Sequence, residues 1–177
     1  MEQMHRNVAV RSVGPSAVRG QPEGLLQVTH EYLQQILLCG IPKISETEYQ
    51  RWLNRRTRGL LNAYSMHPKL KKRPWGVARK AINLFMRDVV YNRYLCEHFA
   101  LGRVERWLEV PLDSQVAKGV RSEARESKTI TVPPAWRGLK RLQYALSRRL
   151  QDCALQLAFR RGMARVHLDI YLWRKSG

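Results

Sequence analysis

Residues 75–99 read WGVARKAINLFMRDVVYNRYLCEHF, a long and very apolar segment around which the rest of the chain is organised. Its apolar residues recur at steps of three and four: Val77, Ala81, Leu84, Phe85, Val89 and Leu95. This spacing predicts an α-helix with a buried face. A second set forms a polar stripe at the same steps: Lys80, Asn83, Arg87 and Tyr91. We therefore expect a central helix with one face left open.

Two helices are expected upstream of this segment. The run 22–39 has helical spacing, with Pro22 suited to a first turn and Gly40 to a stop. Ser45 followed by Glu48 has the spacing of a capping box, so a second helix should begin near residue 46 and end at His67. Residues 1–21 show no sustained period and are predicted to be a flexible basic arm.

Further helices are expected downstream, so that 22–177 form a single helical domain. The predicted segments are a short helix within 101–110, a helix over 113–121, an exposed loop over 122–132, and a long amphipathic helix over 134–161. The run 164–177 fits a final helix, although its alternation also fits a strand. The fold class expected is all-α, a compact single-domain helical bundle.

The charge of the chain points to a polyanionic partner. Lys and Arg number 32 against 14 Asp and Glu among 177 residues, which gives a net charge of +18. Such an imbalance opposes compaction unless a polyanion is bound. Nucleic acid is the leading candidate, an anionic membrane surface is a weaker one, and a merely soluble basic protein is the third alternative. The interval 49–87 contains no acidic residue, which favours a phosphate-facing surface.

Cofactors and membrane insertion are not expected. The three cysteines, Cys39, Cys96 and Cys153, are far apart and give no metal-binding spacing, so we expect buried free thiols, no metal and no cofactor. No apolar run is long enough to span a bilayer, and residues 1–21 lack the apolar core of a signal peptide. The expected setting is intracellular, either cytoplasmic and associated with the nucleoid or nuclear.

Lys80 and Asp113 are the leading candidates for a catalytic pair. A lysine must be neutral to act as a nucleophile, and apolar neighbours together with nearby cations favour the neutral amine. Such an amine can form a Schiff base at a sugar C1′. A carboxylate beside it can stabilise the positive charge that develops there. Asp113 stands where a helix N-cap is expected, so capping is its alternative role.

These residues also carry a resemblance to a known superfamily. WGVARKA at 75–81 resembles the second half of a helix-hairpin-helix with the pattern Gly-Val-Gly-Arg-Lys-Thr, and LDSQVAKGV at 112–120 resembles Asp-Thr-His-Val-x-Arg-Val. The chain is thus similar to the helix-hairpin-helix DNA glycosylases of the endonuclease III group. The Lys-to-Asp separation is closest to archaeal-type 8-oxoguanine DNA glycosylases. Ala78 replaces the second glycine, and Ser114-Gln115 replace Thr-His.

The resemblance implies a base-excision repair enzyme with apurinic/apyrimidinic lyase activity, acting as a monomer on damaged double-stranded DNA. Lys80 would attack C1′ of a flipped nucleotide bearing an oxidised purine, and Asp113 would activate it. The hairpin amides around Gly76 would hold phosphates of the kinked duplex. The DNA-contacting residues expected are Lys71, Lys72, Arg73, Trp75, Gly76, Arg79, Asn83, Arg87, Ser114, Gln115 and Lys118.

A second function class stays open. Lys80 taken alone fits an ordinary lysine whose head reaches the surface of a DNA-facing helix. The chain would then be a non-catalytic DNA- or RNA-binding helical module that keeps only the scaffold. Charge does not separate the two classes, because both need it.

Overall fold

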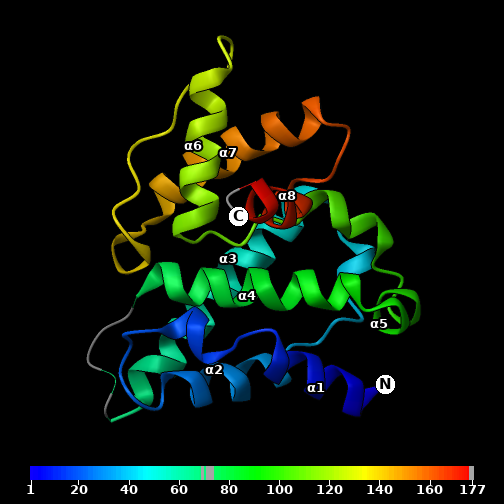
Figure 1. Ribbon diagram of the computed structural model, residues 1–177. Coiled ribbons are helices and arrows are strands. Elements are labelled where there is room, and N and C mark those ends of the chain that lie inside the picture. The colour runs from blue at the N-terminus through cyan, green and yellow to red at the C-terminus, as the bar shows by residue number, and fades with distance from the viewer. Residues whose placement is uncertain (69, 71–73, 176–177) are drawn as a thin grey trace.

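The computed structural model describes residues 1–68, 70 and 74–175, and over these residues it is all-helical (Figure 1). The α-helices are α1 (Glu2–Arg11), α2 (Leu25–Gln34), α3 (Glu46–Met66), α4 (Trp75–Tyr91), α5 (Arg93–His98), α6 (Ser114–Glu126), α7 (Tyr144–Arg160) and α8 (Leu168–Lys175). Short 3-10 helices connect them: η1 (Pro15–Val18), η2 (Ile41–Lys43), η3 (Gly102–Trp107), η4 (Leu139–Arg141) and η5 (Arg165–His167). The predicted all-α class is confirmed.

Helix α4 lies between two hydrophobic clusters. The first cluster is built from α1 to α5 and η3, and it contains most of the buried residues of α4. The second is built from α6, α7 and α8 together with the segment that precedes α6. Figure 1 shows α1 and α2 below α4 and α6, α7 and α8 above it. The central position expected for this helix is confirmed.

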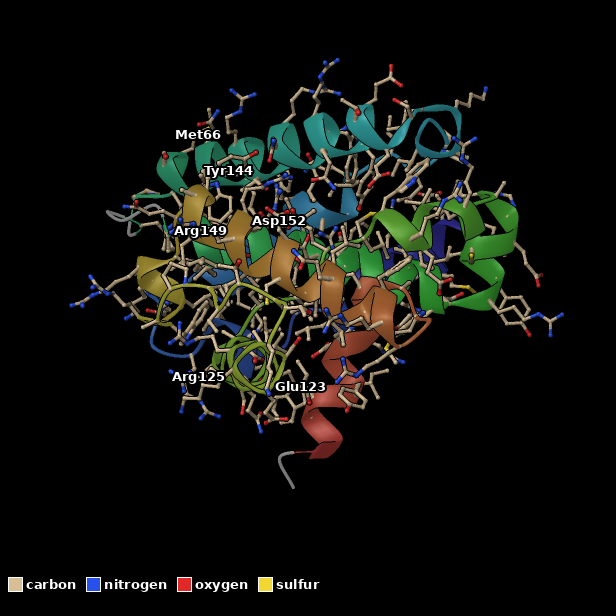
Figure 2. All side chains as sticks on the ribbon, turned by 90° about the horizontal axis from the view of Figure 1, so that it is seen from above. Met66, Glu123, Arg125, Tyr144, Arg149 and Asp152 are labelled. Atoms are coloured by element: carbon tan, nitrogen blue, oxygen red, sulfur yellow. The ribbon has the colours of Figure 1, made fainter. Side chains whose placement is uncertain are left out.

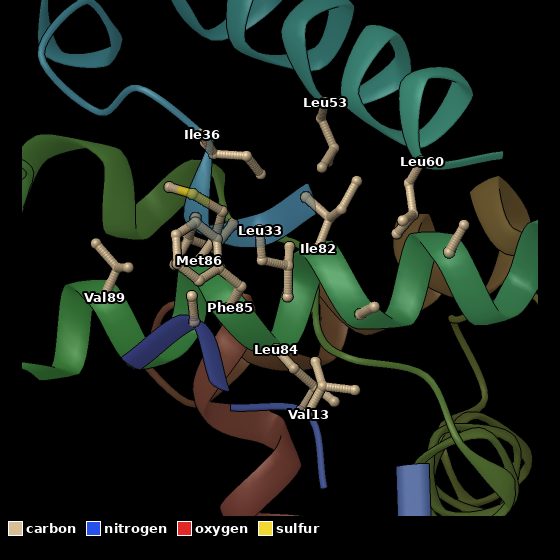
Figure 3. Close-up of a cluster of buried hydrophobic side chains, with 14 of the residues drawn as sticks. Val13, Leu33, Ile36, Leu53, Leu60, Ile82, Leu84, Phe85, Met86 and Val89 are labelled. Carbon is tan, nitrogen blue, oxygen red and sulfur yellow. The ribbon is translucent and has the colours of Figure 1, made fainter. Parts of the chain in front are cut away.

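The buried face of α4 matches the prediction from spacing. All six apolar positions expected to be buried are buried, including Phe85 and Val89. Figure 3 shows Ile82 directed toward Leu33 of α2 on one side of the helix and Leu84 directed toward Val13 on the other. The helix is apolar over more than one stripe because elements pack on it from both sides.

Residues 1–21 do not form the flexible arm expected from their composition. Glu2–Arg11 form helix α1, and Ala9 and Val13 are completely buried in the first cluster. Met4 and Val8, four residues apart, also pack against this cluster. A short helix of this kind is stabilised by tertiary packing rather than by propensity, which is why composition alone suggested an irregular segment.

Helix boundaries differ from the prediction at four places. Helix α2 spans Leu25–Gln34 rather than the predicted 22–39. Helix α4 ends at Tyr91, because the Asn92 side chain accepts a hydrogen bond from Leu95 N (3.1 Å) and caps the separate helix α5. Helix α6 continues past residue 121 to Glu126. Residues 134–143, expected to be helical, are irregular apart from η4, and Gly138 has a φ of +93° that no helix allows.

Local capping signals, by contrast, predicted helix starts correctly. Ser45 and Glu48 form the predicted capping box, with Ser45 N donating to Glu48 Oε2 (2.8 Å) and Glu48 N donating to Ser45 Oγ (3.3 Å). The run at 168–175 is a helix rather than a strand, with Leu168 and Leu172 buried four residues apart. Of the three cysteines expected to be buried, Cys153 is buried, Cys96 is partly buried and Cys39 is exposed.

No helix in the described ranges combines the length and the apolarity that crossing a bilayer requires.

Candidate active site at Lys80 and Asp113

The polar stripe of α4 faces the C-terminal part of the chain. Three residues of the stripe each bind a side chain from that part. Lys80 meets Asp113 at the start of α6, Arg87 meets Asp169 of α8, and the Tyr91 hydroxyl is hydrogen-bonded to His167 Nδ1 (2.7 Å). Because these α4 residues lie on one face, they form a continuous seam between α4 and the second cluster.

Lys80 and Asp113 are brought together as the sequence predicted. Lys80 Nζ donates a hydrogen bond to Asp113 Oδ2 at 3.5 Å, although 33 residues separate the two in the chain. Their side chains are 13% and 22% exposed, so each is largely enclosed but still reached by solvent. Asp113 Oδ1 accepts a hydrogen bond from Val116 N (2.9 Å), which makes Asp113 the N-cap of α6. One carboxylate oxygen therefore caps the helix while the other faces the lysine.

An open cavity of about 930 Å³ lies beside this pair. Its walls come from α4, from the start of α6, from α8 and from residues 11–19, which run from the end of α1 through η1. The lining residues are Arg11, Ser12, Gly14, Ser16, Ala17, Arg19, Lys80, Leu84, Arg87, Pro111, Asp113, Ser114, Gln115, Asp169, Ile170 and Trp173. The segment expected to be a flexible arm thus supplies one wall of the cavity, and with it two arginines.

A second ion pair lies in the same cavity. The Arg87 guanidinium bonds to Asp169 through Nη1 and to Asp88 through Nε (2.8 Å). Burial raises the pKa of Asp169, and Arg87 counteracts this only in part. Asp113 and Lys80 also act on this carboxyl, raising and lowering its pKa respectively, so the two ion pairs form one electrostatic cluster.

A buried network fixes the backbone just before Asp113. Glu109 receives two hydrogen bonds of 2.9 Å from Arg79 and one of 3.1 Å from Asn83 Nδ2. Arg79 Nη1 donates in addition to Asn54 Oδ1 (2.9 Å) and Thr57 Oγ1 (3.0 Å). Burial alone would raise the pKa of Glu109, but the charge and hydrogen bonds of Arg79 hold it below its ordinary value.

The expected DNA contacts of Arg79 and Asn83 are corrected by this network. Arg79 is 2% exposed and Asn83 is also buried, so neither side chain lies on a surface that DNA can reach. A buried charge of this kind requires a paired carboxylate. Glu109 is that partner, and it was missed because it lies 30 residues further along the chain.

Two residues of the C-terminal region also hold the backbone before Asp113 in place. Arg165 donates to the backbone oxygens of Leu108 and Trp107, both at 3.1 Å. The Gln151 side chain accepts from Val110 N (3.1 Å) and donates to Val110 O (2.8 Å). No sequence motif marked Arg165 or Gln151; a glutamine in the middle of the apolar stripe of α7 was the one available signal.

The remaining predicted residues divide into three groups. Ser114 and Gln115 line the cavity with Lys80, whereas Lys118 is exposed on α6. Trp75 is half-buried with its ring edge against Tyr144, at 6.0 Å between centroids. Lys71, Lys72 and Arg73 lie outside the described residues.

Gly76 has a packing explanation. A Cβ at this position would lie 2.4 Å from the Leu139 carbonyl oxygen and 2.7 Å from Leu142 Cβ, so the glycine permits close approach of η4 to α4. A phosphate-binding hairpin at Gly76 stays a prediction.

The site offers amine and carboxylate chemistry. Within the described ranges, no group of three His, Cys, Asp or Glu side chains is arranged to hold a metal ion. What the cavity presents is an ammonium paired with a carboxylate, and a guanidinium paired with a second carboxylate. Comparison of the chain with protein-family models, with curated proteins and with solved structures finds no match, so its function is argued from this geometry.

Proposed function

We propose that this protein is a DNA glycosylase with apurinic/apyrimidinic lyase activity, in which Lys80 is the nucleophile and Asp113 its partner. One observation carries the proposal: Lys80 Nζ lies 3.5 Å from Asp113 Oδ2 at the edge of a cavity of about 930 Å³. Small-molecule sites have volumes of about 300–1,000 Å³, so the cavity is large enough for a nucleotide turned out of a duplex.

The chemistry assigns a role to each group. Asp113 accepts a proton from the Lys80 ammonium, and the free amine attacks C1′ of the nucleotide. The C1′–N bond to the base breaks, and its electron pair leaves with the base, which takes up the proton held by Asp113, so that Asp113 is again a carboxylate. The new Nζ–C1′ bond becomes an imine when the sugar ring opens, and this Schiff base allows elimination of the 3′ phosphate. The carboxylate next to Nζ stabilises the positive charge on the sugar before the imine forms.

The surroundings of the pair suit a phosphorylated substrate. Arg11 and Arg19 line the cavity from the N-terminal segment, and Arg87 lines it from α4. Guanidinium groups recognise phosphate oxygens with two parallel hydrogen bonds. We include in the proposal that α3, α4 and the residues between them act as a helix-hairpin-helix-like element, and that the damaged base is an oxidised purine.

Borohydride trapping tests the proposal directly. The protein is incubated with a labelled duplex carrying 8-oxoguanine, and in parallel with one carrying an abasic site. The mixtures are then reduced and run on a denaturing gel. A covalent band on the lesion duplex that disappears in Lys80→Gln is the expected result. Lys43→Gln, which removes an exposed lysine of η2, should leave the band unchanged.

Other outcomes decide between the parts of the proposal. A band on the abasic duplex alone would keep the lyase and discard the oxidised purine. The absence of a band on both duplexes, with Lys80→Gln as stable as the parent protein by thermal unfolding, would overturn the enzyme assignment.

A non-catalytic nucleic-acid-binding module is the second candidate. It is favoured by the fact that Asp113 already caps α6, a role that needs no chemistry. Tight and salt-sensitive binding to undamaged duplex without any trapped band would support this candidate.

A further inference from the structure

A second concave surface, remote in sequence from Lys80, carries positive charge without carboxylates. It is an open groove of about 770 Å³ formed by the irregular segment 134–143 and the first turns of α7. We refer to it as the 134–149 groove. Its lining residues are Pro134, Ala135, Arg137, Lys140, Arg141, Gln143, Ala145, Leu146 and Arg149.

The four cations of this groove have no carboxylate partner among the described residues. Arg137, Lys140, Arg141 and Arg149 are all exposed, and the ion pairs of the described ranges involve none of them. This contrasts with α4, where Arg79, Lys80 and Arg87 are each paired. Four unpaired cations around one concavity repel each other, and a bound polyanion relieves that repulsion.

The start of α7 adds two features of the same kind. Its N-cap Gln143 makes no side-chain capping hydrogen bond, and its first turn contains no acidic residue, so the positive end of the helix is not compensated there. Tyr144 is 47% exposed at the first position of the helix, with Trp75 behind it. Figure 2 shows Tyr144 and Arg149 on the first turns of α7.

The groove is connected to the Lys80 site through α4. Leu139 and Leu142 pack on Gly76, and Lys80 follows one turn later on the same face of α4. The element that carries the groove is therefore in direct contact with the helix that carries the lysine, and the two concave surfaces share no lining residue.

We propose that the 134–149 groove binds the phosphodiester backbone of the DNA whose nucleotide enters the Lys80 cavity. Three of its four cations are arginines, whose planar guanidinium groups match phosphate oxygens, and the exposed tyrosine offers a surface for a base or sugar. This inference rests on the proposed function for the identity of the polymer, but it concerns binding and is tested without catalysis.

The test is the salt dependence of DNA binding. Fluorescence anisotropy of a labelled duplex with a tetrahydrofuran abasic analogue gives Kd for the full chain between about 50 and 200 mM KCl, the range over which phosphate contacts dominate. Arg137→Gln/Arg141→Gln is the groove variant. Arg103→Gln/Arg106→Gln, which removes two exposed arginines from η3, outside every proposed binding surface, is the charge-matched control.

The groove variant is expected to bind at least about tenfold more weakly at 0.1 M salt and to have a slope of log Kd on log[KCl] lower by about two, because each lost phosphate contact removes about 0.9. The control should retain the parent slope. Equal losses in both variants, or none in the groove variant, would overturn the proposal. An unchanged DNA slope in the groove variant, together with lost binding to phosphatidylserine vesicles, would overturn it as well, because the groove would then serve a membrane surface.

Trapping separates this inference from the proposed function. Lys80→Gln should keep the parent salt slope, because Lys80 is paired with Asp113 rather than unpaired in the groove. If trapping fails in every protein but the groove variant still loses its slope, the groove stands and the enzyme assignment falls. If trapping succeeds and the slopes are equal, the groove inference alone is wrong.

Discussion

Arg79 and Glu109 form a two-point ion pair inside the molecule, with Nε to Oε2 and Nη2 to Oε1 both at 2.9 Å. The pair joins the first full turn of α4 to a backbone segment that reaches Asp113 four residues later. Lys80 is the next residue after Arg79. The buried pair therefore sets the relative position of the two groups proposed to act together, without touching the cavity itself.

Replacing Glu109 by Gln should be strongly destabilising. The substitution leaves the Arg79 guanidinium buried without a counter-charge, which costs about 3–5 kcal/mol. Urea unfolding at neutral pH measures the difference. An Arg79→Met/Glu109→Met double variant is the control, because it removes both charges and should recover most of the loss. A single variant as stable as the parent protein would contradict the importance of the pair.

Glu109 also makes the free energy of unfolding depend on pH. The pKa of Glu109 in the folded protein lies below its ordinary value of 4.5, so its contribution to stability is present above that value and is lost as pH falls through the folded pKa. The free energy of unfolding of the parent protein should therefore decrease below about pH 4.5, and the decrease should be smaller in Glu109→Gln. Urea titrations between about pH 7 and pH 3 test this, and parallel curves for the two proteins would refute it.

The contribution of Asp169 to stability should change with pH in the opposite direction. Burial raises its folded pKa above the ordinary 3.8, so its favourable contribution is present below 3.8 and is lost as pH rises through the folded pKa. At neutral pH, Asp169→Asn is thus expected to change the free energy of unfolding by no more than about 1 kcal/mol. The stability of the variant relative to the parent protein should increase as pH rises from 3.8. Urea unfolding of both proteins across that range is the measurement. A growing deficit of the variant with rising pH would contradict the assignment.

Two substitutions at Asp113 separate capping from catalysis. Asn is as good an N-cap as Asp, so Asp113→Asn should leave thermal stability nearly unchanged, whereas Asp113→Ala should lose about 0.5–2 kcal/mol with the hydrogen bond to Val116 N. Both variants lack the carboxylate that faces Lys80, so both should trap abasic DNA more slowly by at least about tenfold. If Asp113→Asn traps at the parent rate, the carboxylate serves only the helix.

Gly76 and Gly102 are a matched pair of glycines for testing the contact of η4 with α4. Gly76 lies in that contact, and Gly102 is the control. A Cβ at Gly76 meets backbone oxygen and Leu142 at under 3 Å, whereas a Cβ at Gly102 meets nothing within 4 Å. Gly76→Ala should therefore destabilise the fold by about 1–3 kcal/mol through overpacking, and Gly102→Ala by less than about 0.5 kcal/mol. Thermal unfolding of the two variants tests this. Equal effects would mean that η4 moves aside freely.

The parts of the fold that could be predicted are those specified by local signals. Ser45 with Glu48, and Asp113 before α6, fix helix starts through hydrogen bonds within four residues, so the sequence suffices to find them. The spacing of apolar residues likewise identified the buried face of α4. The Lys80–Asp113 pair followed from the same reasoning, because each residue belongs to a helix start whose position was predicted.

The prediction errors arose where contacts between residues far apart in the sequence determine the structure. The acid-free interval 49–87 suggested one phosphate-facing surface, but the cations that α4 contributes to it are paired with carboxylates that come later in the chain. The reverse holds at 134–143, where a helical period continues through Gly138 and the backbone turns there instead. That turn exposes the cations of the 134–149 groove, which helical spacing would have distributed around a helix.

The arrangement of the two clusters on either side of α4 has a consequence for the order of assembly. Apart from Val166, the buried residues of the first cluster end at Leu108, and those of the second begin at Val110. During synthesis the N-terminal residues of a chain emerge first. The helix that carries Lys80 can therefore pack before Asp113 has been made, and Asp169 and Trp173 reach the cavity after all its other walls. The wall that α8 contributes is consequently absent until residues 168–175 have been added, and the cavity beside Lys80 stays open on that side until then.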